Sequence, residues 1–116
     1  MSSKISVGII GLGYVGLPIL RLFTSKKINC FGFEIDKEKV LKIKKNISYI
    51  SDLKNSELKI IKKNQIFSMD DIKNIGKVDY LIFCLPTPLT KQKTPDMSLI
   101  KSAFNKTKKY LKKNQT

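Results

Sequence analysis

Gly11, Gly13 and Gly16 stand close together in "VGIIGLGYVGLPIL", residues 7–20, directly after an apolar run. Glycine weakens both strands and helices, so this spacing needs a chemical reason. A turn from a buried strand into a helix requires a residue without Cβ, which is the role we predict for Gly11. Gly13 would let a diphosphate approach the backbone, and Gly16 would let the helix lie close to the sheet. The unpaired N–H groups at the start of that helix attract phosphate.

An acidic residue supplies the second chemical signal. Glu34, in "FEID", follows a second apolar run at about the twenty-residue distance from the glycines that dinucleotide sites show. A carboxylate there accepts hydrogen bonds from both hydroxyls of an adenosine ribose and repels a 2′-phosphate, which favours NAD over NADP. Lys37 and Lys39 lie nearby and weaken that preference. The alternative is a solvated carboxylate at a strand end, and we interpret Asp36 as a helix cap.

A loop with two prolines, "CLPTPL", gives the third signal. Pro86 and Pro88 fix the backbone around Thr87 and leave its hydroxyl and amide at a rigid place. Ligands of doubly wound sheets bind beyond the carboxyl ends of the strands, so we expect this loop to face the nucleotide. A loop that merely ends a strand is the alternative. The expected cofactor site therefore comprises Gly11, Leu12, Gly13, Tyr14, Val15, Gly16, Glu34, Leu85, Pro86, Thr87 and Pro88.

Alternating strands and helices are needed to position these residues. Apolar runs predict strands at 4–10, 29–33, 65–69 and 78–85, the last being the most apolar. Helical spacing predicts helices at 15–26, 36–45, 58–63 and from Asp96 to Leu111, with one more turn beginning at Ser68 or Asp70 and ending before Gly76. This alternation indicates an α/β fold with a parallel sheet. Right-handed crossovers then give a partial, Rossmann-like doubly wound sheet of about four strands in the order 3-2-1-4.

The apolar positions of the helices form the expected core. The first helix carries Val15, Ile19 and Leu22 on one stripe, with Leu20 and Phe23 beside it. The second carries Val40, Leu41 and Ile43, and residues 46–57 read as a polar connector. The last helix, capped by Asp96, carries Ile100, Ala103, Phe104, Thr107 and Leu111.

The charge of the chain restricts its partners. Its 116 residues fit one domain, and their formal net charge is +14, from twenty-two lysines, one arginine and nine acids. The lysines are spread along the whole chain, which favours a solvated surface, and arginine is the residue that nucleic-acid readers prefer. We therefore do not expect nucleic acid as a partner, although a polyanion-binding face stays the alternative. No apolar run is long enough for a membrane span, and the start lacks a signal peptide, so we expect a cytoplasmic protein.

The sequence predicts no catalytic residue and no metal site. It contains no histidine, the side chain best suited to proton transfer near neutral pH. Cys30 and Cys84 have no metal-binding spacing and lie in apolar runs, so we expect buried free thiols. An apolar setting raises a thiol pKa, which argues against a nucleophilic role for Cys84.

Three separated stretches carry a family resemblance. "GIIGLGYVGLP", "FEIDKEKV" and "CLPTPLTKQKTPDMS" together resemble the N-terminal region of UDP-glucose/GDP-mannose dehydrogenases. The "PTPL" form is most similar to the branch acting on UDP-N-acetylhexosamines, such as the UDP-N-acetylglucosamine and UDP-N-acetylmannosamine 6-dehydrogenases. The resemblance covers nearly the whole chain. It implies oxidoreductases that oxidise C6 of a nucleotide-linked sugar twice with two NAD, for polysaccharide biosynthesis. It also implies that Glu34 is the ribose-binding acid, Lys39 a basic ribose or phosphate contact, and Leu85 to Leu89 a loop touching NAD.

The resemblance also has a limit. Such enzymes are several times longer and carry a catalytic cysteine in a later glycine-rich segment, which this sequence lacks. We therefore expect residues 1–116 to be an incomplete N-terminal NAD-binding domain that binds NAD but is inactive alone, the nucleotide sugar being bound only in the full-length enzyme. The fourth strand would present an open edge, through which the chain could form a homodimer.

Other function classes stay open beside this one. They are a non-catalytic nucleotide-binding module and a lysine-rich binder of nucleic acid or anionic lipid on the same scaffold. A different dehydrogenase, acting for instance on 3-hydroxy acids, is an alternative that the "PTPL" loop argues against.

Overall fold

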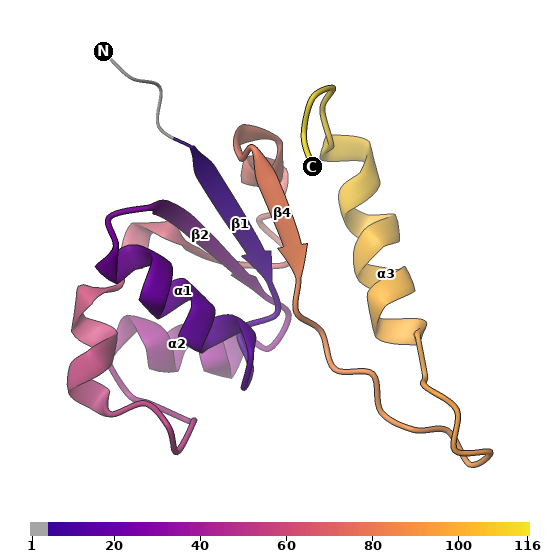
Figure 1. The fold of residues 1–116 in the computed structure, drawn as a ribbon, viewed down its shortest axis with the longest axis horizontal. Helices are drawn as coiled ribbons and strands as arrows, with labels where there is room; N and C mark the ends of the chain where they lie inside the picture. The colour runs from indigo at the N-terminus through magenta and orange to yellow at the C-terminus, as the bar shows by residue number, and fades with distance from the viewer. Residues whose placement is uncertain (1–4) are drawn as a thin grey trace.

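Four parallel strands form the centre of the protein. The computed structural model describes residues 5–116, with a sheet in the order β3-β2-β1-β4 (Figure 1). The strands are β1 (Ser6–Ile10), β2 (Asn29–Glu34), β3 (Ile66–Ser68) and β4 (Tyr80–Phe83). The predicted α/β class and the strand order 3-2-1-4 are confirmed. Residue 4, the first of the expected first strand, lies outside the described residues.

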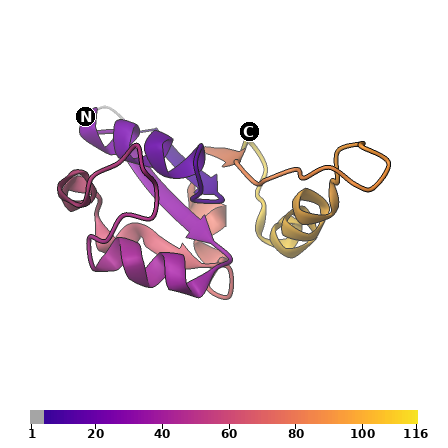
Figure 2. The same ribbon diagram turned by 90° about the horizontal axis from the view of Figure 1, so that it is seen from below.

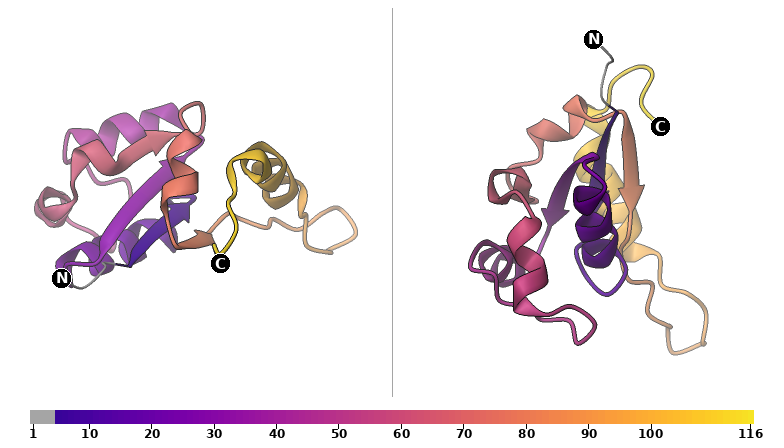
Figure 3. Two further views of the ribbon diagram at one scale, coloured as in Figure 1. Left: turned by 90° about the horizontal axis from the view of Figure 1, so that it is seen from above. Right: turned by 60° about the vertical axis from the view of Figure 1, so that its left-hand side comes forward.

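The helices are divided between the two faces of this sheet. They are α1 (Gly16–Ser25), α2 (Lys37–Lys44) and α3 (Ser98–Thr107), with 3-10 turns η1 (Asn55–Ile60), η2 (Lys63–Gln65), η3 (Lys73–Lys77) and η4 (Lys108–Tyr110). Helices α1 and α2 lie together, whereas α3 lies beyond β4 at the end of a long loop (Figures 1 and 2). The left view of Figure 3 shows the same separation. In the part of the chain that the structure describes, no helix is long and apolar enough to cross a lipid bilayer.

The first face of the sheet packs on α1 and α2. Val7 and Ile9 of β1 lie in one buried cluster with residues of both helices, namely Leu17, Leu20, Val40 and Ile43. The predicted stripe of α1 is wrong in its phase, because Val15 is 61% exposed and Leu22 46% exposed. Leu41 of α2 is also exposed, contrary to expectation. Apolar residues surround α1 almost completely, so their spacing alone does not say which side faces the sheet.

The opposite face is lined with aromatic rings. Phe67 of β3 stacks on Phe33 of β2, with ring centroids 5.5 Å apart. Phe83 of β4 lies 6.4 Å from Phe104 of α3, measured between ring centroids. Ala103 of α3 completes a buried cluster with Phe33. This contact places α3 beside the carboxyl ends of the strands, where the candidate site lies.

Strand β4 is shorter and less buried than expected. The sequence predicts a strand over 78–85, but the structure limits it to Tyr80–Phe83, with Tyr80 exposed and its other residues half-buried. Its outer edge is partly paired, because the Thr116 N–H donates to the Asp79 carbonyl at 2.9 Å and the Leu81 N–H donates to the Thr116 carbonyl at 2.7 Å. The expected open edge is therefore occupied at this point.

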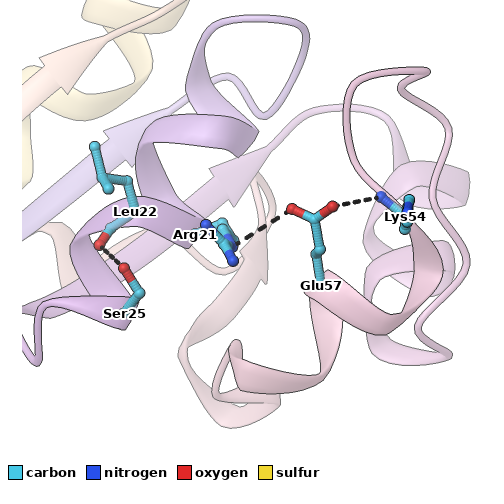
Figure 4. A network of polar contacts seen from close by, with 5 residues as sticks. All are labelled: Arg21, Leu22, Ser25, Lys54 and Glu57. Atoms are coloured by element: carbon cyan, nitrogen blue, oxygen red, sulfur yellow. Dashed lines mark hydrogen bonds and ion pairs between the residues drawn. The ribbon is translucent and has the colours of Figure 1, made fainter.

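The segment between α2 and β3 is more ordered than a polar connector. Ile50 and Leu53 are buried in it, and the helix predicted at 58–63 is replaced by the 3-10 turns η1 and η2. Glu57 of η1 joins this segment to α1, since its carboxylate lies 3.8 Å from Arg21 and accepts the Lys54 N–H at 3.3 Å (Figure 4). In α1 itself, the Ser25 hydroxyl donates to the Leu22 carbonyl at 2.6 Å (Figure 4).

Two further predicted boundaries shift. The turn expected to end before Gly76 is η3, which begins later and includes Gly76. Asp96 accepts the Ser98 N–H at 2.9 Å and so marks the start of α3, although Met97 holds the cap position. Phe104 is exposed rather than buried, and Leu111 lies beyond the helix, which ends at Thr107.

Candidate dinucleotide-binding site

The three glycines differ in what surrounds them. Gly11 has φ +97°, and a Cβ on it would lie 2.5 Å from the Cys84 carbonyl oxygen. A Cβ on Gly16 would overlap the Gly11 carbonyl oxygen, so α1 lies directly against the end of β1. A Cβ on Gly13 would meet no atom within 4 Å. Gly11 and Gly16 are therefore required by the fold, whereas Gly13 leaves space above the turn.

The start of α1 presents free backbone donors. No side chain caps this helix and its first turn carries no acid, whereas Asp36 caps α2. Across residues 5–116, no hydrogen-bond acceptor is found for the N–H groups of Gly13, Tyr14, Val15 and Gly16. Unpaired N–H groups at the positive end of a helix dipole form an anion site. The turn thus offers what a diphosphate requires.

The carboxylate of Glu34, at the end of the neighbouring strand β2, is hydrogen-bonded to the glycine turn. This carboxylate is 5% exposed, and it accepts two backbone N–H groups, Leu12 at 2.8 Å and Asp36 at 2.8 Å. The expected cap is confirmed, because Asp36 accepts the Glu38 N–H at 2.9 Å. The two bonds of Glu34 were not foreseen from the sequence. An ionised carboxylate accepts about four hydrogen bonds, so capacity for ribose hydroxyls remains.

A cleft of about 600 Å³ lies over the carboxyl ends of β1, β2 and β4. Eight of the residues predicted for the cofactor site border it, namely Gly11, Gly13, Tyr14, Val15, Glu34, Lys39, Leu85 and Pro86. Leu12 and Gly16 are buried beneath it, and Thr87 and Pro88 are exposed outside its lining. The structure thus brings all three sequence motifs together at one place.

One wall of the cleft was missed by the sequence reasoning. It comes from α3, which contributes Leu99, Ser102, Ala103 and Lys106. The amphipathic pattern predicts this helix but not its place, which depends on the long loop before it. Lys106 and Lys39 put two cations on the lining, which suits a phosphate-bearing ligand.

The thiols are both free. Burial raises the pKa of Cys30 to about 12 and also raises the pKa of Cys84, which borders the cleft and is half-buried. Neutral thiols are poor nucleophiles, so the raised pKa argues against a nucleophilic role for Cys84, which stays a prediction. Among the described residues, no group of three or more metal-ligating side chains occurs.

The position of the turn defines the class of protein. It lies where the strand order reverses, between β1 and β4, at the carboxyl ends of parallel strands. A glycine turn at this switch point, followed by a helix and by an acid at the end of β2, is a Rossmann-type dinucleotide-binding domain. Residues 5–116 match the NAD-binding domain of the UDP-glucose/GDP-mannose dehydrogenase family, and the chain belongs to that family.

Relatives agree with this membership, and a solved structure agrees with the fold. UDP-N-acetyl-D-glucosamine 6-dehydrogenase of Salmonella typhi is 31% identical over 101 residues, which cover 86% of this chain and 23% of that protein. Protein CapL of Staphylococcus aureus is 30% identical over 92 residues, 79% of this chain and 21% of that one. UDP-D-ManNAc dehydrogenase from Pyrococcus horikoshii shares the fold, with a TM-score of 0.80 at 22% identity over 96% of this chain and 27% of that one. The chain spans about a quarter of the length of the relatives it matches.

Proposed function

We propose that this chain is the NAD-binding part of a nucleotide-sugar 6-dehydrogenase acting on a UDP-N-acetylhexosamine. Family membership supports the cofactor. The substrate class rests on relatives named as UDP-N-acetyl-D-glucosamine and UDP-N-acetyl-D-mannosamine dehydrogenases, and on the "PTPL" loop.

In this proposal the described residues hold the adenosine diphosphate half of NAD. The free N–H groups at the start of α1 bind the diphosphate, with Gly13 leaving room for it. Glu34 accepts hydrogen bonds from the adenosine ribose, and Lys39 lies beside it on the same lining. Leu85 and Pro86 form the side of the cleft next to β4.

Bound NAD would accept hydride, and two NAD with one water take the C6 alcohol to the carboxylate, releasing three protons. Cys84, a thiol on the described lining of the cleft, is a poor nucleophile because burial raises its pKa. We therefore propose that residues 5–116 bind the cofactor and that the groups acting on the sugar belong to other parts of the enzyme. On this proposal the chain by itself shows no dehydrogenase activity.

A single observation carries this proposal. The uncapped start of α1 and the carboxylate of Glu34 border one cleft, over the switch point of the sheet. Neither a solvated strand end nor a plain strand-ending loop accounts for both features together.

Calorimetric titration tests the binding half of the proposal. We expect heat on adding NAD or ADP-ribose and none on adding the nicotinamide nucleoside alone. No heat at millimolar NAD contradicts the proposal, and saturable binding of single-stranded RNA in its place would favour the polyanion-binding alternative.

A kinetic assay tests the inactivity. NADH absorbance should not rise with NAD and either UDP-N-acetylglucosamine or UDP-N-acetylmannosamine. Any steady NADH formation that requires the sugar contradicts this part of the proposal.

A further inference from the structure

The backbone of Leu12 is held from two sides. Its N–H donates to Glu34 Oε1 at 2.8 Å, and its carbonyl oxygen accepts the hydroxyl of Tyr49. The two partners come from different elements, since Glu34 ends β2 and Tyr49 lies in the segment after α2. The peptide groups before and after Leu12 are therefore both fixed by side chains.

Tyr49 is itself firmly placed. Its ring is half-buried against the cluster between the sheet, α1 and α2. Lys39 Nζ lies 5.4 Å from the ring centroid, within the range of a cation–π contact. Burial raises the pKa of Tyr49, and the carboxylates of Glu34 and Asp36 raise it further. The hydroxyl therefore keeps its proton and acts as a donor.

The bond to Leu12 determines where the next amide points. The Leu12 carbonyl and the Gly13 N–H belong to one trans peptide unit, in which the two groups point in opposite directions. With the carbonyl directed at Tyr49, the Gly13 N–H is directed away from it. Gly13 borders the cleft, and its N–H has no acceptor in residues 5–116. A carbonyl that accepts a hydrogen bond also polarises its peptide, which makes that N–H a stronger donor.

We propose that Tyr49 is a positioning residue for the diphosphate of NAD, holding the Leu12–Gly13 peptide so that the Gly13 N–H faces the ligand. This inference rests on the proposed function and adds to it a residue outside the three sequence motifs. Tyr49 touches no ligand in this arrangement and acts only through the turn.

Tyr49→Phe removes the hydroxyl and keeps the ring over which Lys39 lies. Tyr110→Phe is the matched control, because Tyr110 carries a similar lysine contact, with Lys109 Nζ 5.2 Å from its ring centroid, and lies outside the cleft. Calorimetry on both variants and on the unaltered chain measures the dissociation constants for NAD, ADP and adenosine, with thermal unfolding recorded in parallel.

We expect Tyr49→Phe to weaken NAD and ADP by about fivefold, the effect of one hydrogen bond. Adenosine lacks the diphosphate, so its affinity should be unchanged, and Tyr110→Phe should bind all three ligands as the unaltered chain does. A purely structural role for Tyr49 would not separate ADP from adenosine. Equal NAD affinity in Tyr49→Phe, or an equal loss for adenosine, overturns the inference.

A measurement without substitution protects the test against a variant that fails to fold. In the unaltered, isotope-labelled chain, NAD and ADP should shift the Gly13 amide resonance strongly, and adenosine should not. If NAD binds and this amide does not respond, the inference is wrong while the proposed function stands. If the unaltered chain does not bind NAD at all, the proposed function fails and the inference falls with it.

Discussion

A methyl group on Gly16 would overlap the carbonyl oxygen of Gly11, so the first turn of α1 rests on the first residue of the glycine turn. Gly13 lies between them and has nothing within 4 Å of the place of a Cβ. Gly11 and Gly16 are thus required by the packing of the fold, whereas Gly13 leaves space for a ligand.

Alanine substitutions should separate these two roles. Gly16→Ala should lower the free energy of unfolding by about 3 kcal/mol, because the overlap forces α1 away from the sheet. Gly13→Ala should change it by less than about 0.5 kcal/mol but weaken NAD by about tenfold, since the methyl group enters the ligand's space. Chemical denaturation and calorimetry measure the two quantities. A stable Gly16→Ala, or a Gly13→Ala that binds NAD normally, contradicts this division.

Glu34→Gln should affect stability and affinity together. Replacing one carboxylate oxygen with NH₂ leaves either the Leu12 or the Asp36 N–H without an acceptor, which costs about 1–3 kcal/mol. Losing charge-assisted bonds to the ribose should weaken NAD by about 1–3 kcal/mol. Glu38→Gln is the control, because Glu38 is exposed on α2. An unchanged melting temperature in Glu34→Gln would show that its backbone contacts are dispensable.

Cofactor choice should depend on Lys39 and not on Lys37. Lys37 pairs with Asp70 at 2.9 Å and does not border the cleft, whereas Lys39 does. We expect NAD to bind about tenfold more tightly than NADP, because Glu34 repels a 2′-phosphate. Lys39→Met should increase this ratio and Lys37→Met should leave it unchanged. Competition titrations measure it, and a ratio that responds to Lys37 would show that the wrong lysine was chosen.

Thiol labelling provides an independent view of the cleft. Cys84 borders the cleft, so bound NAD should slow the alkylation of Cys84. In Cys84→Ser, the alkylation that NAD slows should be absent. Burial raises the pKa of both thiols, and only the thiolate reacts, so the rate should increase as pH rises. Cys30, with a pKa of about 12, should react only on unfolding. Labelling of Cys84 at the same rate with and without NAD would place the ligand elsewhere.

Salt dependence distinguishes the nucleotide site from a lysine surface. NAD carries few charges, so its affinity should fall gradually between about 50 and 200 mM salt, whereas a polyanion releases many counterions and its affinity falls steeply. Parallel titrations with NAD and with single-stranded RNA measure both slopes. Tighter binding of RNA than of NAD at the higher salt concentration would favour the polyanion-binding class.

Patterns of neighbouring residues in the sequence were sufficient to predict the order of strands and helices in this fold. The strand order follows from alternating strands and helices, and the cap at Asp36 follows from residues two positions apart, so both could be predicted. The phase of α1 could not, because its apolar residues surround the helix. The close contact of Gly16 with Gly11, directly after β1, fixes which side is buried.

The parts of the candidate site that consist of sequence motifs could be predicted. The parts that depend on contacts between residues far apart in the sequence could not. The glycine turn and Glu34 are visible in the sequence, but the bond from Leu12 to Glu34 joins residues 22 positions apart. Tyr49 and Lys106 carry no motif at all. Their positions come from the packing of the segment after α2 and from the loop that carries α3.

The side chain of Leu12 is fully buried, and a Cβ on Gly32 of β2 would lie 2.9 Å from its Cδ1 atom. The peptide groups of Leu12 shape the glycine turn, and its side chain is also part of the buried core. Heat tolerance and cofactor retention must therefore change together at this position, and a variant selected for one will be altered in the other.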